Sequence, residues 1–320
     1  MKKHYHIIAL LLLALTLNYS LNDVAASKQI KSKINLKYNN LSKRQTLNVY
    51  YPQKKHSKAY PVVLFLHGGY YEMGSKTNDL KKNKKNFTEA GYAYVSMNYR
   101  LTKEAKFPGA ANDVKTAIRY LKTNAKKLSI NPNKIFIIGH SAGANLGSLI
   151  ASTPGISSFD DEKILYSKVN NRIAGFIGVS GFYNLESFLM IDDYQKKHNN
   201  NPNGAKEFLS YEEASYIYSR KRVLKHYQHL IESKNSGDLS IANTFNYLDN
   251  IKVPILLVAG KKDTIIGYQQ TAEFCNALKK HKKKVTCRYY KNKSHLYKSY
   301  QKKSDYQYFI KWLNKQKSKK

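Results

Sequence analysis

Short apolar segments alternate with amphipathic helical segments along most of this chain. Strands that are apolar on both faces need cover on both faces, which is the arrangement of a mostly parallel sheet between layers of helices. The alternation therefore predicts an α/β fold whose functional side chains gather at the carboxyl ends of the strands. The segments with the length and composition of buried strands are Thr46–Tyr51, Val62–Leu66, Tyr92–Met97, Ile135–Ile138, Ile173–Val179, Ile255–Val258 and Val285–Tyr290.

Helical periodicity fills several of the gaps between these strands. In Ala110–Asn124 and Tyr268–Lys280, apolar side chains recur on one face at helical spacing. Further helices are expected over Ala142–Ala151, directly after the fourth strand, and over Asp305–Asn314. Residues Ser187–Leu239 contain no clear core strand and are rich in Tyr, Asn and Lys, so we expect a mostly helical insertion there, a partial cap over the carboxyl edge of the sheet.

The first residues have the pattern of an export signal. The basic pair Lys2–Lys3 is followed by the apolar run Ile7–Leu17 and by the small residues Val24–Ala26. The apolar run is shorter than the ~20 residues of a membrane-spanning helix. We therefore expect residues 1–26 to be a cleavable signal peptide and residues 27–320 to form a single exported domain, periplasmic or secreted.

The two cysteines lie in neighbouring predicted elements. Cys275 belongs to the helix expected over Tyr268–Lys280, and Cys287 belongs to the strand expected over Val285–Tyr290. Export permits a disulfide between them. The sequence leaves open whether they form that bridge or remain two separate thiols, and either arrangement is structural.

The formal net charge of +34 raises the question of a polyanionic partner. The lysines are scattered along the chain, however, and no nucleic-acid-binding module accompanies them, so we expect no specific nucleic-acid partner. Non-specific contact with anionic surfaces remains open. His226 and His229 have no Cys or carboxylate at ligand spacing, and no phosphate-cradling or nicotinamide-binding glycine motif is present. We therefore expect neither a metal nor a cofactor.

A serine stands between two glycines at the junction of a predicted strand and a predicted helix, in Gly139–Gly143. A serine hydroxyl is a poor nucleophile near neutral pH, so it needs a base and donors for the developing oxyanion. Flanking glycines permit the sharp strand-to-helix turn that exposes such a serine. The context predicts that Ser141 is a nucleophile, and the alternative is a turn serine that bonds its own backbone.

A second glycine-containing turn, His67–Tyr71, follows the strand predicted over Val62–Leu66. Paired glycines allow backbone N–H groups to face an anionic centre without an intervening side chain. We expect the N–H groups of Gly69, Tyr70 and Ala142 to form an oxyanion hole. His67 belongs to this turn, so we expect it to brace the loop and not to act as the base.

These motifs together resemble an α/β-hydrolase of the esterase type. With the two turns, "NYRL" at Asn98–Leu101 and "FPGAANDVKTAIRYL" at Phe107–Leu121 are similar to the branch that contains hormone-sensitive-lipase-like carboxylesterases, feruloyl/acetyl-xylan esterase-like proteins and kynurenine formamidases. The resemblance runs from about Leu47 to Trp312, apart from the insertion. Tyr70 stands where the lipase-like pattern has a third glycine, which is closer to the formamidase-like subgroup.

The resemblance implies a chain order of serine, acid and histidine, and the chain supplies both partners. Asp263 lies just beyond the sixth predicted strand, and His295 lies beyond the last one. The alternatives for them are a turn aspartate and a surface histidine. Asp249 precedes its strand, at the wrong end of the sheet, and His281 lies among lysines, so neither suits the site.

The sequence therefore predicts an exported serine hydrolase that cleaves small-molecule carboxylic esters. In this hypothesis Ser141 is the nucleophile, His295 the base and Asp263 the acid, and the reaction passes through an acyl-enzyme. One alternative is a formamidase-like or peptidase-like amide hydrolase. Another is a basic protein that binds polyanions or surfaces on a hydrolase fold, although such a protein has no need of an intact triad.

Overall fold

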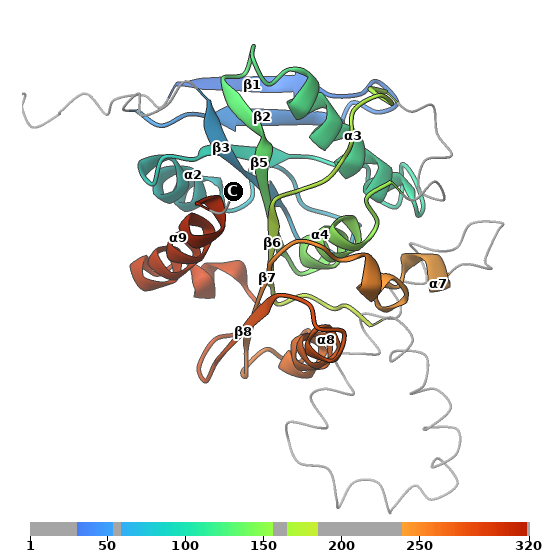
Figure 1. The fold of residues 1–320 in the computed structure, drawn as a ribbon, viewed down its shortest axis with the longest axis vertical. Coiled ribbons are helices and arrows are strands. Elements are labelled where there is room, and N and C mark those ends of the chain that lie inside the picture. The colour runs from blue at the N-terminus through green and yellow to red at the C-terminus, as the bar shows by residue number, and fades with distance from the viewer. Residues whose placement is uncertain (1–30, 54–58, 156–164, 185–238, 319–320) are drawn as a thin grey trace, which may run out of the picture. The chain divides into compact units, whose positions relative to one another are not determined.

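An eight-stranded sheet runs through the computed structural model, which describes residues 31–53, 59–155, 165–184 and 239–318 (Figure 1). The strand order is β1-β2-β4-β3-β5-β6-β7-β8. Strands β3 to β8 are parallel, whereas β2 pairs with both β1 and β4 in the antiparallel direction. The strands are β1 Ser32–Lys37, β2 Thr46–Tyr50, β3 Tyr60–Leu66, β4 Ala93–Met97, β5 Ile130–His140, β6 Gly175–Val179, β7 Ile255–Gly260 and β8 Val285–Tyr290.

Helices cover both faces of this sheet, which confirms the predicted α/β fold (Figure 1). Helices α2 and α9 contact each other on one face, and α3, α4 and α8 lie on the other. In the part of the chain that the structure describes, no helix is long and apolar enough to cross a membrane. The helices are α2 Leu80–Glu89, α3 Gly109–Thr123, α4 Ala142–Ser152, α7 Leu239–Ala242, α8 Tyr268–Lys280 and α9 Lys303–Lys317, with short 3₁₀ turns η2 Thr244–Asn250 and η3 Tyr297–Tyr300.

Strand β1 and helix α2 were not predicted, and both are polar. Strand β1 is an edge strand without a single buried residue, so its sequence lacks a core pattern. Helix α2 is rich in lysine and buries only Asn83, Phe87 and Thr88. The expected strand over Ile173–Val179 was too long, because β6 begins only at Gly175. The expected signal peptide and the expected cap, except Leu239 at the start of α7, lie outside the described residues.

The motifs at Asn98–Leu101 and Phe107–Leu121 meet in a buried ion pair. Arg100 follows β4, and its Nη2 donates to Oδ1 of Asp113 on α3 at 2.8 Å. The backbone N–H of Arg100 also donates to Asp113 Oδ2, and Gln45 Nε2 donates to Oδ1. The bonds from Arg100 tie the end of β4 to α3, and the bond from Gln45 ties the start of β2 to the same helix.

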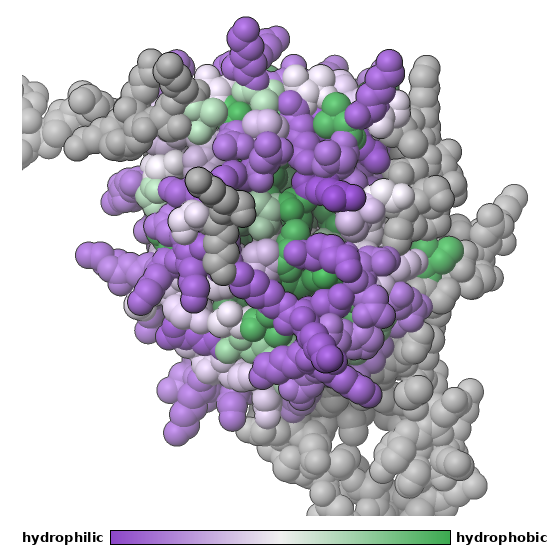
Figure 2. Space-filling view, in the orientation of Figure 1, coloured by the Kyte–Doolittle hydropathy of each residue, from purple (hydrophilic) through white to green (hydrophobic). Residues whose placement is uncertain are grey.

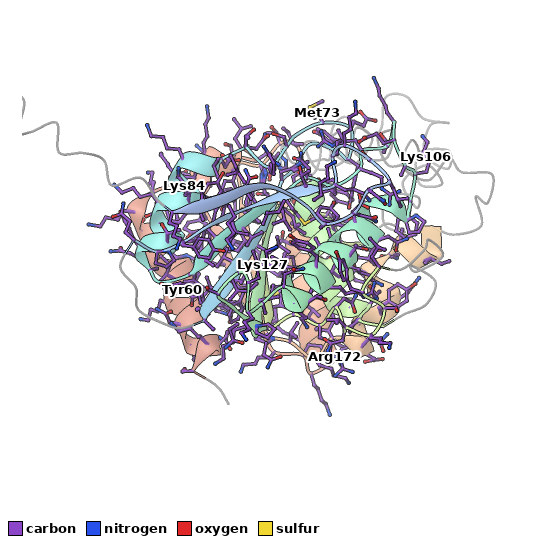
Figure 3. The ribbon with its side chains drawn as sticks, turned by 90° about the horizontal axis from the view of Figure 1, so that it is seen from above. Tyr60, Met73, Lys84, Lys106, Lys127 and Arg172 are labelled. Carbon is purple, nitrogen blue, oxygen red and sulfur yellow. A yellow bond between two sulfur atoms is a disulfide. The ribbon has the colours of Figure 1, made fainter. Side chains whose placement is uncertain are left out.

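The positive charge is spread over the described surface. Figure 2 shows hydrophilic side chains across much of the visible face, interrupted by a few apolar patches. The basic residues labelled in Figure 3, Lys84, Lys106, Lys127 and Arg172, lie in different parts of the molecule. This distribution is typical of a solvated surface, and contact with anionic surfaces stays a prediction.

Cys275 and Cys287 form a disulfide between α8 and β8, which resolves the alternative that the sequence left open. The bridge closes a loop with a sequence separation of 12 residues. A loop of that length restricts the unfolded chain enough to stabilise the fold by about 3 kcal/mol in the chain-entropy model. Helix α8 follows the loop that contains Asp263, and β8 precedes the loop that contains His295, so the bridge joins two elements that flank these loops.

We expect reduction of this disulfide to lower the free energy of unfolding by about 3 kcal/mol. The measurement is urea unfolding followed by circular dichroism, with and without dithiothreitol. The double variant C275S/C287S is the control, because it should unfold at the lower urea concentration in both buffers. An unchanged midpoint for the reduced wild type would contradict the prediction.

Candidate functional site

Ser141 occupies a strained turn between β5 and α4. Its backbone has φ 55° and ψ −120°, a combination that residues with a side chain rarely adopt. A Cβ on Gly139 would lie 2.1 Å from the carbonyl oxygen of Gly143, and a Cβ on Gly143 would lie 2.2 Å from that of Leu66. Both flanking positions therefore require glycine, because the turn packs backbone against backbone. This packing holds the serine at the carboxyl edge of the sheet, opposite the end at which Tyr60 is labelled in Figure 3.

The structure brings Ser141, His295 and Asp263 together in one hydrogen-bonded line. His295 Nε2 lies 3.0 Å from Ser141 Oγ, and His295 Nδ1 lies 2.9 Å from Asp263 Oδ2. The three residues are buried, with 1%, 7% and 4% of their surfaces exposed. Since a carboxylate only accepts, Nδ1 carries the imidazole proton and Nε2 accepts from the serine hydroxyl.

Asp263 divides its two carboxylate oxygens between a turn and the histidine. Oδ1 accepts from the backbone N–H groups of Ile265 at 3.0 Å and Ile266 at 2.8 Å, while Oδ2 faces His295. The turn aspartate that the sequence left as an alternative is therefore present in the same residue as the candidate acid. The two backbone bonds fix the orientation of the carboxyl group.

The loop that carries Asp263 docks on the loop that carries His295. The backbone N–H of Lys262 donates to the carbonyl oxygen of Lys293 at 3.1 Å. A Cβ on Gly260 would lie 2.0 Å from that same oxygen, so the close approach requires a glycine at the end of β7. The Lys293 ammonium pairs with the buried carboxylate of Asp305 and lies 3.9 Å from the ring centroid of Tyr290. These contacts anchor the histidine loop two residues before His295.

The backbone of the predicted oxyanion loop is left-handed at three consecutive residues. Gly69 has φ 120°, Tyr70 has φ 55° and Tyr71 has φ 64°. Such conformations cost on the order of 1–3 kcal/mol for residues with a side chain, so the surroundings must enforce them. The carbonyl oxygen of Gly69 accepts from the N–H groups of Glu72 and Met73, which closes the turn. A Cβ on Gly69 would lie 2.2 Å from the Met73 carbonyl oxygen.

Tyr71 fastens this loop to the helix behind the serine. Its hydroxyl donates to Asn145 Oδ1 on α4 at 2.6 Å, and Asn145 Nδ2 donates to the carbonyl oxygen of Phe182 at 3.1 Å. The carbonyl oxygen of Tyr71 accepts from the N–H of Thr102. The side chain and the backbone of one tyrosine thus both hold the strained conformation in place.

The oxyanion hole stays a prediction, and two of its three expected donors have an N–H group without a partner in the described part of the chain. The N–H groups of Gly69 and Ala142 make no hydrogen bond with any residue that the structure describes. Ala142 begins α4, so its N–H also lies at the positive end of the helix dipole. Tyr70 is half-buried and makes contacts of its own, so its part in the oxyanion hole stays a prediction.

His67 packs inside the predicted oxyanion loop. Its Nδ1 donates to the carbonyl oxygen of Gly68 at 2.8 Å, and its ring stacks on Tyr99 with centroids 4.3 Å apart. Nε2 is buried and has no hydrogen-bond partner among the described residues. Burial lowers the pKa of His67 to about 4, because a charged imidazole would lose its hydration there. A neutral bracing role fits this environment.

We expect the buried His67 to make the protein acid-sensitive. Between pH 6.5 and pH 4 the unfolded chain binds a proton at this residue and the folded chain does not, so stability falls as the pH falls. The loss approaches about 3 kcal/mol at pH 4 relative to neutral pH. Urea unfolding from pH 7 to pH 4 measures the slope. The variant H67N should unfold with a shallower slope over this range, and an identical slope in both proteins would contradict the assignment.

Asp249 and His281, which were rejected as members of the triad, lie outside the site. Asp249 is exposed in η2, where its carboxylate is 2.8 Å from Nδ1 of His281 at the end of α8. The two rejected candidates therefore pair with each other. No three His, Cys, Asp or Glu side chains of the described residues gather as a metal-binding group. His226 and His229 lie outside those residues.

His140 also lies at the site, although no sequence pattern indicated it. His140 ends β5 directly before Ser141, and its Nε2 lies 2.7 Å from the carbonyl oxygen of His295. The only available signal was its position at the end of the strand, next to the serine. Its partner is 155 residues further along the chain, so this bond depends on the path of a distant loop.

Comparisons with known sequences place the chain in a family of hydrolases. A family model described as BD-FAE matches residues 47–278. An ethyl acetate hydrolase of Pseudomonas putida is 31% identical over 101 residues, which is 32% of this chain and 32% of that protein. Carboxylesterase NlhH of Mycobacterium tuberculosis is 32% identical over 91 residues, or 28% of each chain. The matched part thus spans about a third of the length of these relatives.

The comparisons with solved structures support the fold over more of the chain. A truncated carbohydrate esterase from gut microbiota superposes with a TM-score of 0.74 at 20% identity, covering 92% of this chain and 99% of that one. Esterase B of Lactobacillus rhamnosus superposes with a TM-score of 0.69 at 15% identity, covering 99% of this chain and 96% of that one. At these identities the likeness concerns the fold alone.

Proposed function

Because the chain belongs to the BD-FAE family of α/β-hydrolases, we propose that it is an exported serine esterase that hydrolyses small-molecule carboxylic esters. The observation that carries this proposal is the line of hydrogen bonds from Ser141 through His295 to Asp263 at the carboxyl edge of the sheet. Relatives named as an ethyl acetate hydrolase and a carboxylesterase support the ester as the bond that is cleaved.

Acylation begins with the hydroxyl of Ser141. Its oxygen attacks the ester carbonyl carbon while its proton passes to Nε2 of His295, and the carbonyl electron pair moves onto the oxygen. The N–H groups of Gly69 and Ala142 donate to that oxyanion, joined by Tyr70 in the predicted oxyanion hole. When the tetrahedral intermediate collapses, the bond to the alcohol oxygen breaks and His295 gives its proton to the leaving alcohol.

Deacylation repeats these steps with water. The water oxygen attacks the acyl carbon while His295 takes a proton from the water. His295 then gives this proton to Ser141 Oγ as the bond to the acyl group breaks and the acid product leaves. In both acylation and deacylation, Asp263 accepts the hydrogen bond from Nδ1–H of His295. It thereby stabilises the imidazolium, which forms twice per turnover. An ester suits this machinery, because an alcohol leaves more readily than an amine.

Labelling with a fluorophosphonate probe tests the nucleophile. We expect folded wild-type protein to be labelled at Ser141, as mapped by mass spectrometry of the digested protein, and S141A to remain unlabelled. Heat-denatured wild type is the matched control, because the serine loses its activation with the fold. Absence of labelling in the folded protein would overturn the enzyme proposal, and salt-sensitive retention on heparin would then favour the polyanion-binding alternative.

A substrate panel tests the bond that is cleaved. We expect short p-nitrophenyl esters to be hydrolysed faster than N-formyl amides or peptides of similar size. Activity on the amides alone, with labelling of Ser141 intact, would replace the esterase by the formamidase-like or peptidase-like alternative. The labelling experiment therefore tests the identity of the nucleophile, and the substrate panel independently tests which bond is cleaved.

Export is the third part of the proposal, and it is supported by the leader pattern in residues 1–26. We expect the full gene, expressed in a bacterial host, to yield a processed protein outside the cytoplasm. Mass spectrometry of that fraction should give a chain that begins at Ser27. A full-length product confined to the cytoplasm would contradict this part of the proposal and leave the esterase activity unaffected.

A further inference from the structure

His140 joins the turn of the serine to the loop of the histidine. It is the last residue of β5, where it pairs with Val179 of β6, so the sheet fixes its backbone. Its Nε2 lies 2.7 Å from the backbone carbonyl oxygen of His295. The two imidazole rings lie with their centroids 5.1 Å apart. The residue next to the candidate nucleophile therefore holds the backbone of the candidate base.

The same imidazole also touches the oxyanion loop. A Cβ on Gly68 would lie 3.0 Å from Nδ1 of His140 and 3.1 Å from Cβ of Ser141, so this loop packs directly on the pair. On its remaining side the ring of His140 lies 5.3 Å from that of Tyr297 in η3, measured between centroids. The side chain of His140 thus lies against both the histidine loop and the predicted oxyanion loop, while its backbone adjoins the serine turn.

The hydrogen bond determines the protonation of His140. A carbonyl oxygen only accepts, so Nε2 must carry a proton. Burial, together with the neighbouring His295, lowers the pKa of His140 to about 3, so the imidazole is neutral at any working pH and Nδ1 carries no proton. The other groups that face the ring, Gly68 and the phenol of Tyr297, carry no charge near neutral pH. His295 therefore gains its proton without a second cation beside it.

We propose that His140 is a positioning residue for the esterase reaction: its Nε2–H donates to the carbonyl oxygen of His295 and so holds that imidazole in reach of Ser141. The inference rests on the proposed function. Within the triad, the histidine loop is attached to the serine turn only by the neutral hydrogen bond from Ser141 Oγ to His295 Nε2. The bond from His140 supplies a second attachment that does not change during the reaction.

The test compares two replacements of similar length that differ in one donor. Methionine fills much of the space of the imidazole and cannot donate, whereas the amide of glutamine can reach the carbonyl oxygen. We expect H140M to lower kcat on a p-nitrophenyl ester by about 10- to 100-fold, as a misplacement of about 1 Å does, with KM changed less than twofold. H140Q should restore kcat to within about fivefold of the wild type, because the donor returns.

The melting temperature of each variant controls for the fold. H140N gives the same comparison as H140M if the methionine variant melts too low, because the shorter amide falls short of the carbonyl oxygen. A merely structural role would lower the melting temperature in step with activity and would show no rescue by glutamine. The proposal is overturned if H140M keeps kcat within threefold of the wild type, or if H140Q is as impaired as H140M at equal melting temperature.

The rate of fluorophosphonate labelling separates this inference from the proposed function. If wild-type protein is labelled at Ser141 and H140M is labelled five or more times more slowly, both stand. If H140M is labelled as fast as the wild type, the role of His140 fails while the nucleophile stands. If the wild type is not labelled at all, the proposed function fails, and the inference fails with it.

Discussion

Replacing Ser141 by alanine is expected to lower kcat/KM on a p-nitrophenyl ester by on the order of 10⁶-fold, to a residual rate that binding and oxyanion stabilisation alone sustain. Without the hydroxyl, no acyl-enzyme forms, and His295 and Asp263 have no proton to move. Because the two partners act only through this oxygen, the loss should be as large as that from removing all three side chains.

The measurement is initial rate with a matched control in the same helix. Ser152, at the other end of α4, donates to the carbonyl oxygen of Leu149 and has no place in the site. S152A should therefore keep kcat/KM within about twofold of the wild type, as an ordinary helix substitution does. More than 1% residual activity in S141A, after contaminating esterases are excluded by its failure to label, would contradict the assignment of the nucleophile.

The core of the fold was predictable because its strands are apolar throughout. Every residue of β3, β4 and β7 is buried, and strands of this kind are recognised in a sequence as short, mostly apolar runs. Strand β1 and helix α2 gave no such signal, because an exposed edge strand and a lysine-rich helix bury too little apolar surface to leave a periodic pattern. Cys275 and Cys287 were individually placed correctly, but their pairing depends on how α8 lies against β8.

Ser141 was the part of the site most open to prediction, since its turn is specified by glycines within two residues. Asp263 and His295 followed from the resemblance and from the rule that parallel strands end at one edge, which brings residues 122 and 154 positions away to the serine. Contacts between loops, such as Tyr71 with Asn145 and His140 with His295, have no local signature. They depend on loop paths that only the folded chain defines.

Asp263→Asn is expected to lower kcat by about 10⁴-fold while the protein stays folded. The reason lies in the two backbone N–H groups of Ile265 and Ile266, which require an acceptor at the Oδ1 position. The amide oxygen of the asparagine will take that position, and its NH₂ group will therefore face Nδ1 of His295. An NH₂ group donates, so the imidazole must move its proton to Nε2, where it no longer accepts from Ser141.

The same asymmetry supplies the controls for this variant. D263N keeps both turn bonds, so its midpoint of urea unfolding should stay near that of the wild type, and ¹⁵N NMR should show His295 in the tautomer protonated at Nε2. D249N changes an exposed carboxylate that pairs with His281, and its kcat should be unaffected. A kcat for D263N within tenfold of the wild type would mean that the carboxylate does not set the tautomer. A matching loss in D249N would mean that charge, and not orientation, is what the reaction needs.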